Sequence, residues 1–272
     1  MPIISLKNVA FSYDKKTPVI KNLNLDINEG EYVAIIGANG SGKSTIAKLF
    51  NALLIPDAGE VLVCGLSSAN KKNLFEIRKS VGVVFQNPDN QLVASIVEDD
   101  VAFGPENLGV KREEIKERID FALNAVNMKE YRRFSPARLS GGQKQRIAVA
   151  GVLAVKPKVL VLDESTAMLD PRGRKDLLAV AKNLNDNGMT VVTITHYMEE
   201  VLMANKVYVI SDGEIALSGT PEEIFSDASK IKELGLELPE SVYLANKLKN
   251  KGINLNGNIL TEKDLEEALC EF

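Results

Sequence analysis

The chain has 272 residues, of which 45% are hydrophobic and 26% charged, and its formal net charge is -4. This length accommodates one large domain with a small appendage, and the composition is that of a soluble globular protein. The apolar runs are too short to span a bilayer and no block of basic residues is present, so membrane-spanning and nucleic-acid-binding proteins are excluded as first interpretations.

The first segments, residues 3–13 and 23–27, alternate apolar with polar side chains, which predicts half-buried antiparallel strands in a sheet of their own. Runs rich in Val and Ile follow at residues 32–36, 81–85, 159–162, 190–195 and 207–210, separated by helical patterns. Such runs indicate a buried, mainly parallel sheet. The predicted fold class is therefore α/β.

A glycine-rich segment lies between the strand at 32–36 and a helical pattern at 45–54, and it matches G-x-x-x-x-G-K-[ST]. In this context the backbone N–H groups and the helix N-terminus cradle phosphates, while Lys43 reaches the β and γ phosphates and the Ser44 hydroxyl holds Mg²⁺. The alternative is a glycine-rich turn that merely connects a strand to a helix. The expected nucleotide ligands are Gly37, Asn39, Gly40, Ser41, Gly42, Lys43, Ser44 and Thr45.

Helical periodicity prevails from about residue 87 to 156, notably at 113–126 and 142–153, and predicts a helical subdomain inserted between two core strands. The next strand ends in Asp163 and Glu164, where the ligand sites of parallel sheets lie. We expect Asp163 to partner Mg²⁺, either directly or through one of the ion's own ligands, and Glu164 to orient and polarise the attacking water. A solvated pair of acids at a strand end is the alternative.

His196, the only histidine, follows the strand at 190–195. Beside a γ-phosphate it would donate a hydrogen bond and sense that phosphate, although a lone histidine there can simply terminate a strand. Beyond it, Thr220 and Thr261 each begin a helix-start pattern with acids in the first turn. We therefore divide the chain into a nucleotide-binding domain, 1–225, with a helical subdomain at about 87–156, and a C-terminal helical module, 226–272.

The string Leu139-Ser140-Gly141-Gly142-Gln143 resembles the signature motif of the ABC family. The resemblance covers about residues 3–220 and implies a head-to-tail dimer of ATPase subunits. In such a dimer each ATP lies between the phosphate loop of one subunit and Ser140 and Gly142 of the other. The chain departs from the family at Ser165, where proline is usual after the glutamate.

The same resemblance implies roles for three further positions. Tyr13 resembles the aromatic residue that stacks on adenine, with Phe11 as a competing candidate. Gln86 resembles the glutamine that contacts Mg²⁺ and the attacking water. Asp170 resembles the aspartate at the dimer interface, although a local helix cap at Pro171 explains it as well.

The stretch from Gln86 to Phe103 resembles the ATPase subunits of energy-coupling-factor transporters and of related cobalt and nickel importers. This implies an ATPase, using ATP and Mg²⁺, at the cytoplasmic face of the membrane. Its expected partners are a second ABC ATPase of the same or a related chain, a transmembrane coupling subunit that contacts this stretch, and a substrate-binding membrane component. We interpret the acids Glu98, Asp99 and Asp100 as receivers of arginines from the coupling subunit, with complementarity to the helix dipole as the alternative.

The C-terminal module resembles the extension that holds such subunits together, and a solvated tail is the alternative. No nucleic-acid partner is expected, and the transported substrate is not encoded in this chain. The competing functions are a soluble, non-transport ABC ATPase and a nucleotide-dependent regulatory module without turnover. Because Glu164 and His196 are both present, a regulatory module is disfavoured.

Overall fold

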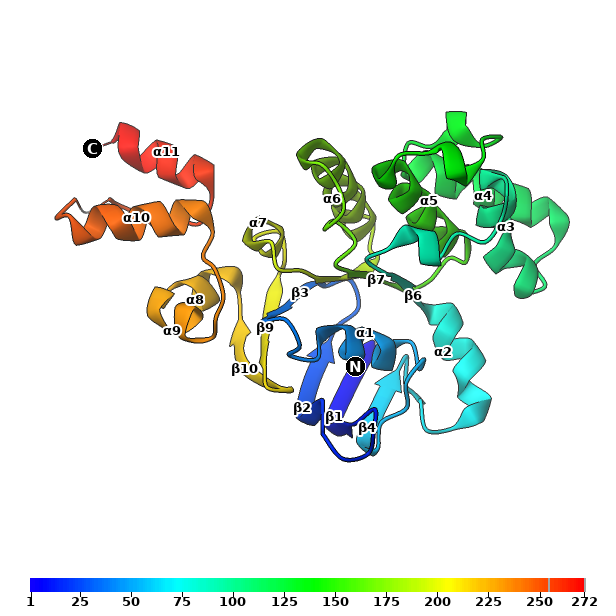
Figure 1. Cartoon of the computed structure of the whole chain (residues 1–272), viewed down its shortest axis with the longest axis horizontal. Helices are drawn as coiled ribbons and strands as arrows, with labels where there is room; N and C mark the ends of the chain where they lie inside the picture. The colour runs from blue at the N-terminus through cyan, green and yellow to red at the C-terminus, as the bar shows by residue number, and fades with distance from the viewer. Residues whose placement is uncertain (254, 272) are drawn as a thin grey trace.

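The computed structural model describes residues 1–253 and 255–271. These residues form two β-sheets with helices around them (Figure 1). The strands are β1 (Ile4–Phe11), β2 (Ile20–Ile27), β3 (Tyr32–Gly37), β4 (Ala58–Val63), β5 (Leu66–Ser67), β6 (Val81–Val84), β7 (Val159–Asp163), β8 (Thr190–Ile194), β9 (Lys206–Ser211) and β10 (Glu214–Gly219). The α-helices are α1 (Lys43–Phe50), α2 (Leu74–Ser80), α3 (Val97–Asn107), α4 (Arg112–Ala125), α5 (Gly141–Ala154), α6 (Pro171–Asp186), α7 (Met198–Val201), α8 (Pro221–Phe225), α9 (Ala228–Glu233), α10 (Glu240–Asn250) and α11 (Glu262–Cys270).

The larger sheet has the strand order β10-β9-β3-β8-β7-β6, and all of its pairs are parallel except β10 with β9. The smaller sheet, β2-β1-β4-β5, is antiparallel throughout. The predicted α/β class with a mainly parallel sheet and a separate N-terminal antiparallel sheet is thus confirmed. Strands β4, β5 and β10 were not predicted, because β5 is only two residues long and the other two begin with exposed, polar or glycine residues.

The large sheet is buried on both faces, as its continuous apolar strands predict. Alternate residues of β3 belong to different cores: Val33 and Ile35 pack with α1 and the antiparallel sheet, whereas Tyr32, Ala34 and Ile36 pack with α5, α6 and the helical region. This alternation follows from the two-residue period of a strand. The large sheet therefore carries α1, which follows the glycine-rich loop, on one face and α5 on the other face.

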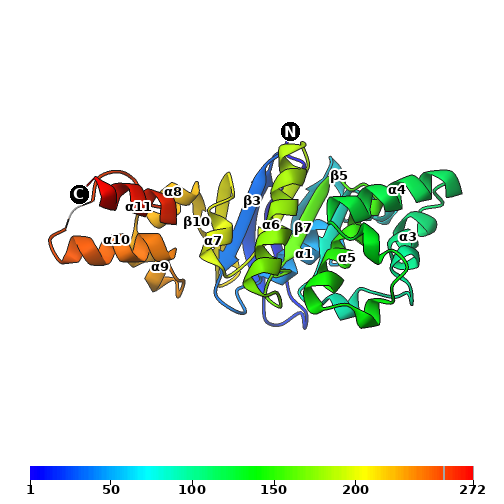
Figure 2. The ribbon, with the colours of Figure 1, turned by 90° about the horizontal axis from the view of Figure 1, so that it is seen from above.

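The helices α3 and α4 lie beyond the β6 edge of the large sheet, and α10 and α11 lie beyond its β10 edge (Figures 1 and 2). The helix starts predicted at Thr220 and Thr261 are confirmed, since each forms a reciprocal capping box, with Glu223 and Asp264 respectively. Among the described residues, none of the helices combines the length and the apolar character that crossing a membrane requires.

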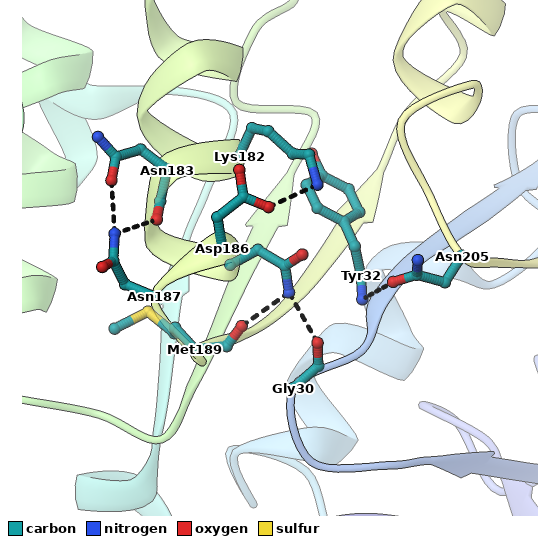
Figure 3. Close-up of polar contacts among 9 residues, drawn as sticks. Gly30, Tyr32, Lys182, Asn183, Asp186, Asn187, Met189 and Asn205 are labelled. Carbon is teal, nitrogen blue, oxygen red and sulfur yellow. Dashed lines mark hydrogen bonds and ion pairs between the residues drawn. The ribbon is translucent and has the colours of Figure 1, made fainter.

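At the amino ends of the strands, the side chain of Asn185 ties α6 to the sheet. Its Nδ2 donates to the carbonyl oxygens of Gly30 and Met189, both at 2.9 Å, and Figure 3 shows these carbonyls converging below α6. Nearby, the Tyr32 N–H donates to Asn205 Oδ1 at 2.8 Å. Because Gly30 and Met189 precede β3 and β8, these hydrogen bonds hold the C-terminal end of α6 at the edge opposite to the carboxyl ends of the strands.

Candidate active site

The strand order places four of the predicted functional segments side by side. Strands β3, β8, β7 and β6 are consecutive neighbours and parallel, so their carboxyl ends share one edge of the sheet. The glycine-rich loop follows β3, His196 follows β8, Glu164 follows β7 and Gln86 follows β6. Segments far apart in the sequence are thereby gathered at one edge by strand pairing alone.

The glycine-rich loop wraps tightly around the start of α1. Gly40 and Gly42 have φ values of 81° and 105°, which side-chain-bearing residues rarely adopt. A Cβ at Gly42 would also lie 2.7 Å from Ile20 Cδ1. The Lys43 ammonium donates to the carbonyl oxygens of Gly37 and Ala38 at 2.8 and 3.0 Å, so the loop curls around its own lysine. Burial lowers the pKa of Lys43, and the negative charges of Glu164 and Asp163 oppose that shift.

Ser44 and Asp163 meet at the start of α1, where the Ser44 hydroxyl donates to Asp163 Oδ1 at 3.1 Å. Burial raises the pKa of Asp163 and the neighbouring charge of Glu164 adds to the shift, while the Ser44 hydrogen bond opposes it. A hydroxyl and a buried carboxylate in contact are oxygen donors of the kind that Mg²⁺ takes. No group of three or more His, Cys, Asp or Glu side chains that could hold a metal ion is found among the described residues.

Glu164 and Gln86 line one cavity of about 440 Å³ together with Ser44 and Asp163. Glu164 has a φ of 49°, in the left-handed region that costs a non-glycine residue about 1 kcal/mol or more. Its N–H donates to the carbonyl of Ile194, the last residue of β8, at 2.9 Å. The strained turn therefore fixes Glu164 against the neighbouring strand while its side chain faces the cavity.

His196 is exposed and lies two residues beyond the end of β8. Its ring stacks at a tilt on Tyr197, with the ring centroids 4.1 Å apart. The guanidinium carbon of Arg174 lies 3.4 Å from the centroid of the same Tyr197 ring. The His196 ring thus packs against Tyr197, whose ring also contacts Arg174, and His196 is exposed to solvent.

The structure discriminates between the two candidate aromatic residues near the loop. Phe11 is buried, whereas the Tyr13 side chain is 58% exposed and its hydroxyl lies 3.2 Å from Thr45 Oγ1 at the start of α1. The two rings pack edge to face with their centroids 5.0 Å apart. Only Tyr13 therefore offers a free ring face beside the phosphate loop.

Ser140 and Asp170 lie apart from the glycine-rich loop, in a second cavity of about 530 Å³ that has no lining residue in common with the first. Ser140 caps α5 through a reciprocal capping box with Gln143. Asp170 caps α6, since its Oδ1 accepts from the Gly173 N–H at 2.7 Å. Gly142 also lines this cavity, so the segments at 140–143 and 168–173 form one polar surface at two helix N-termini.

Two particular contacts between the segment after β6 and α5 were not predicted from the sequence. The Gln145 side chain is fully buried and its Nε2 donates to the carbonyl of Phe85 at 3.1 Å. Lys144 pairs with Asp89 at 2.7 Å. The segment after β6, which carries Gln86, is therefore bound to the helix that carries Ser140.

The acidic run at the start of α3 departs from the sequence interpretation. Glu98 pairs with Arg132 and Arg133 of the same chain at 2.5 and 2.6 Å, and Asp100 is buried and accepts from two backbone N–H groups. Only Asp99 is exposed and makes no hydrogen bond or ion pair within the described part of the chain. Two of the three acids thus hold the helical region together, and are occupied before any partner arrives.

Comparison with known proteins agrees with this geometry. A family model described as ABC transporter matches residues 20–167. The energy-coupling factor transporter ATP-binding protein EcfA1 of Caldanaerobacter subterraneus subsp. tengcongensis is 51% identical over 98% of this chain and 99% of that protein. The protein of the same name from Clostridium novyi is 50% identical over 99% and 98%.

Two solved structures are similar to this chain. CbiO1 from Clostridium perfringens, described as part of an ABC transporter complex, has a TM-score of 0.79 at 36% identity, covering 90% of this chain and 99% of that one. The dimeric cassette MJ0796 bound to ADP and Pi has a TM-score of 0.72 at 30% identity, covering 80% and 98%. The chain therefore belongs to the ABC transporter family, and within it to the ATP-binding proteins of energy-coupling factor transporters.

Proposed function

We propose that this chain is the ATP-hydrolysing subunit of an energy-coupling-factor-type importer for a vitamin or a transition-metal ion, and that it works by ATP-driven, head-to-tail closure of two ATPase subunits. The observation that carries the proposal is the meeting of the phosphate loop, Glu164, His196 and Gln86 at one edge of the sheet. Family membership supplies the reaction, and the arrangement of these residues suits phosphoryl transfer, which depends on positioning and charge stabilisation. No observation favours a soluble non-transport ATPase or a regulatory module.

In the proposed reaction the phosphate loop binds ATP through its backbone N–H groups, and Lys43 turns from its carbonyl partners to the phosphates. Tyr13 stacks its free face on the adenine. Mg²⁺ bound by Ser44, Asp163 and Gln86 would neutralise charge on the phosphates as the bond to the leaving group breaks. The buried, partly desolvated environment of Asp163 favours such a cation, because the cation would offset the cost of burying a carboxylate.

Glu164 holds the attacking water and accepts its proton, since its turn fixes the carboxylate at the cavity that Gln86 also lines. Gln86 orients that water, and His196 donates a hydrogen bond to the γ-phosphate from its supported ring. These three residues follow the neighbouring strands β8, β7 and β6, so strand pairing brings them to the same edge of the sheet. The head-to-tail closure proposed above would place a second subunit over the γ-phosphate.

The segment at 140–143 suits that place over a partner's γ-phosphate. Neither Gly141 nor Gly142 has a left-handed φ, and an added Cβ would meet no atom closer than 3.6 Å, so this chain's own packing does not require glycine at either place. Close approach of a partner's phosphate would require it. Ser140 at the N-terminus of α5 adds a hydroxyl and the helix dipole. We therefore assign Ser140 and Gly142 to the ATP of the partner and Asp170 to the dimer interface.

We further propose that the stretch from Gln86 to Phe103 contacts a transmembrane coupling subunit, at the cytoplasmic face of the membrane, in a complex with a substrate-binding membrane component. Phe103 and Val93 are 51% and 63% exposed on this stretch, and Asp99 is its free acid. The module at 226–272 is proposed to hold two ATPase subunits together between cycles. The partner ATPase is the same chain or a related one.

Glu164→Gln tests the proposed reaction. The amide keeps the shape of the side chain but cannot accept a proton, so the variant should bind ATP, close on it with its partner ATPase, and lose hydrolysis by about a hundredfold or more. The matched control is Glu199→Gln, which alters an exposed acid on α7 and should hydrolyse at the wild-type rate. Hydrolysis by Glu164→Gln in the assembled transporter at a rate close to that of the control would refute the assignment.

Asp99→Lys tests the proposed docking surface. Reversal of this exposed charge should reduce co-purification of the membrane subunits while the isolated chain keeps its melting temperature and ATP affinity. Asp100 is unsuited to this test because its buried carboxylate caps the backbone at Val93 and Ala94. Unchanged co-purification of Asp99→Lys would contradict the role of the acid.

A further inference from the structure

A buried carboxylate lies directly behind the histidine turn. Glu200 is only 1% exposed although it belongs to the four-residue helix α7, whereas its neighbour Glu199 is exposed. Glutamate is almost never fully buried unless it has partners. Because Glu200 lies four residues after His196, its partners show which segments are joined to the turn that carries His196.

The direct partner of Glu200 comes from the segment after β7. The Thr166 hydroxyl donates to Glu200 Oε1 at 2.6 Å, and both side chains are buried. Thr166 lies two residues after Glu164 and four before Asp170. This hydrogen bond therefore joins the turn that carries His196 to the segment that connects Glu164 with Asp170.

A second connection runs through α6. Arg174 Nε lies 4.0 Å from Glu200 Oε1, and the same guanidinium covers the Tyr197 ring on which His196 stacks. Arg174 belongs to the helix that Asp170 caps. The carboxylate, the arginine and the aromatic ring thus form one contact chain between His196 and the start of α6.

Burying Glu200 together with its polar neighbours costs free energy that packing alone would not require. Burial raises the pKa of Glu200, opposed by the hydroxyls of Thr166 and Thr195 and by the positive charge of Arg174. The buried Tyr32 hydroxyl has no hydrogen-bond partner among the described residues, and burial together with the charge of Glu200 raises its pKa. Well-packed apolar side chains would fill the same space at lower cost, so the polar cluster calls for another explanation.

We propose that Glu200 is a positioning residue that locks the segment at 165–170 to the His196 turn, so that the γ-phosphate contact of one subunit and the interface contact of Asp170 change together. The inference rests on the proposed function, because it gives these residues their roles at the ATP and at the dimer interface. In this arrangement loss of the γ-phosphate at His196 is transmitted to Asp170 through a hydrogen bond rather than through the mobile nucleotide. Removing the bond should weaken closure without altering the phosphate loop.

The test uses the full chain with Glu164→Gln, in which ATP is bound but not consumed. The ATP concentration at half-maximal dimerisation of the nucleotide-binding domains is measured by fluorescence energy transfer between labels on the two ATPase subunits, because the proposed C-terminal contact would keep the subunits associated without ATP. The ATP affinity of the separated chain is measured with a fluorescent ATP analogue at low protein concentration. Adding Glu200→Ala should raise the half-maximal ATP concentration by about tenfold, the value of one hydrogen bond to a charged group, while the ATP affinity of the separated chain stays within about twofold. Adding Glu199→Ala, the exposed neighbour, should change neither quantity.

Two further variants distinguish positioning from simple loss of stability. Thr166→Val keeps the side-chain volume and should shift dimerisation as Glu200→Ala does, and it carries the test if Glu200→Ala fails to fold. The two changes together should be no worse than either alone, because they remove the same bond. Glu200→Gln, whose amide oxygen still accepts from Thr166, should restore most of the closure.

The outcomes separate the two proposals. If Glu164→Gln, paired with its partner ATPase, shows no ATP-dependent dimerisation of the nucleotide-binding domains, the proposed function is refuted, and this inference with it. If it dimerises and both Glu200→Ala and Thr166→Val dimerise at the same ATP concentration as their parent, the proposed function stands and the positioning role is overturned. Additive shifts in the double variant would also overturn it, because independent effects would then act at the two sites.

Discussion

Replacing Glu98 by glutamine removes the charge at the centre of an internal ion-pair network while it keeps the shape of the side chain. Glu98 and Arg132 are 17% and 20% exposed, and Arg132 also pairs with Asp120 of α4. The network therefore joins the start of α3, α4 and the turn after it. Arg133, the other partner of Glu98, is 78% exposed and adds little because solvent screens the pair.

The magnitude follows from the Arg132 bond alone. A hydrogen bond between charged groups contributes about 1.5–3 kcal/mol, and partial exposure together with the remaining amide oxygen reduces the expected loss to about 1–2 kcal/mol. For a chain of this size that loss lowers the melting temperature by about 2–5 °C. The measurement is thermal unfolding of Glu98→Gln by circular dichroism at pH 7, with Asp99→Asn as the control, which should melt with the wild type.

The pH dependence provides a second, independent check. The hydrogen bond from Arg132 holds the pKa of Glu98 below its ordinary value of 4.5, so the folded state binds this proton less readily than the unfolded state. The stabilisation is therefore complete above pH 4.5 and is lost as the pH falls through the lowered pKa. The difference in melting temperature between wild type and Glu98→Gln should close over that acid range. Equal melting temperatures at pH 7, or a loss as large in Asp99→Asn, would refute the internal role of Glu98.

Two further replacements test the glycine-rich loop and the attachment of α6 to the sheet. Gly42→Ala should weaken binding of a fluorescent ATP analogue by more than tenfold, since its φ is left-handed and its Cβ would collide with Ile20, and wild-type affinity would contradict the loop geometry. Asn185→Ala leaves the carbonyls of Gly30 and Met189 without their side-chain donor, so the free energy of unfolding measured in urea should fall by about 1–3 kcal/mol with an unchanged KM for ATP. An unchanged free energy of unfolding would show that water replaces this donor at no cost.

The elements that could be predicted from the sequence are those whose signals are local. The glycine-rich loop, the buried strands and the capping boxes at Thr220 and Thr261 each depend on residues within a few positions of one another. The placement of Glu164 and His196 at strand ends was predictable for the same reason. Their proximity could not be derived from the residues alone, because it depends on β8 pairing between β3 and β7, and that strand order is a property of the whole sheet.

The acids of α3 show where local reasoning fails. Glu98, Asp99 and Asp100 are adjacent in the sequence and chemically alike, yet one pairs with Arg132, one is exposed and one caps a loop. Successive helix positions point in directions about 100° apart, so neighbours in a run meet different surroundings. The partner of Glu98 lies 34 residues away and could not be identified without the fold. Glu200 escaped notice for the same reason, since its partner Thr166 is also 34 residues distant.

Segments that follow a central strand and segments that follow an edge strand differ in how freely they can move. β3, β8 and β7 are each paired on both sides, so the loop, His196 and Glu164 are held in one rigid frame, whereas β6 is the edge strand and its following segment has sheet contacts on one side only. That segment is bound instead to α5, through Gln145 and Lys144. Any displacement of the segment on contact with a nucleotide must therefore carry α5, because the buried amide of Gln145 cannot lose its carbonyl partner without the cost of an unsatisfied polar group. We expect the orientation of Ser140 toward a partner subunit to follow Gln86 for this reason.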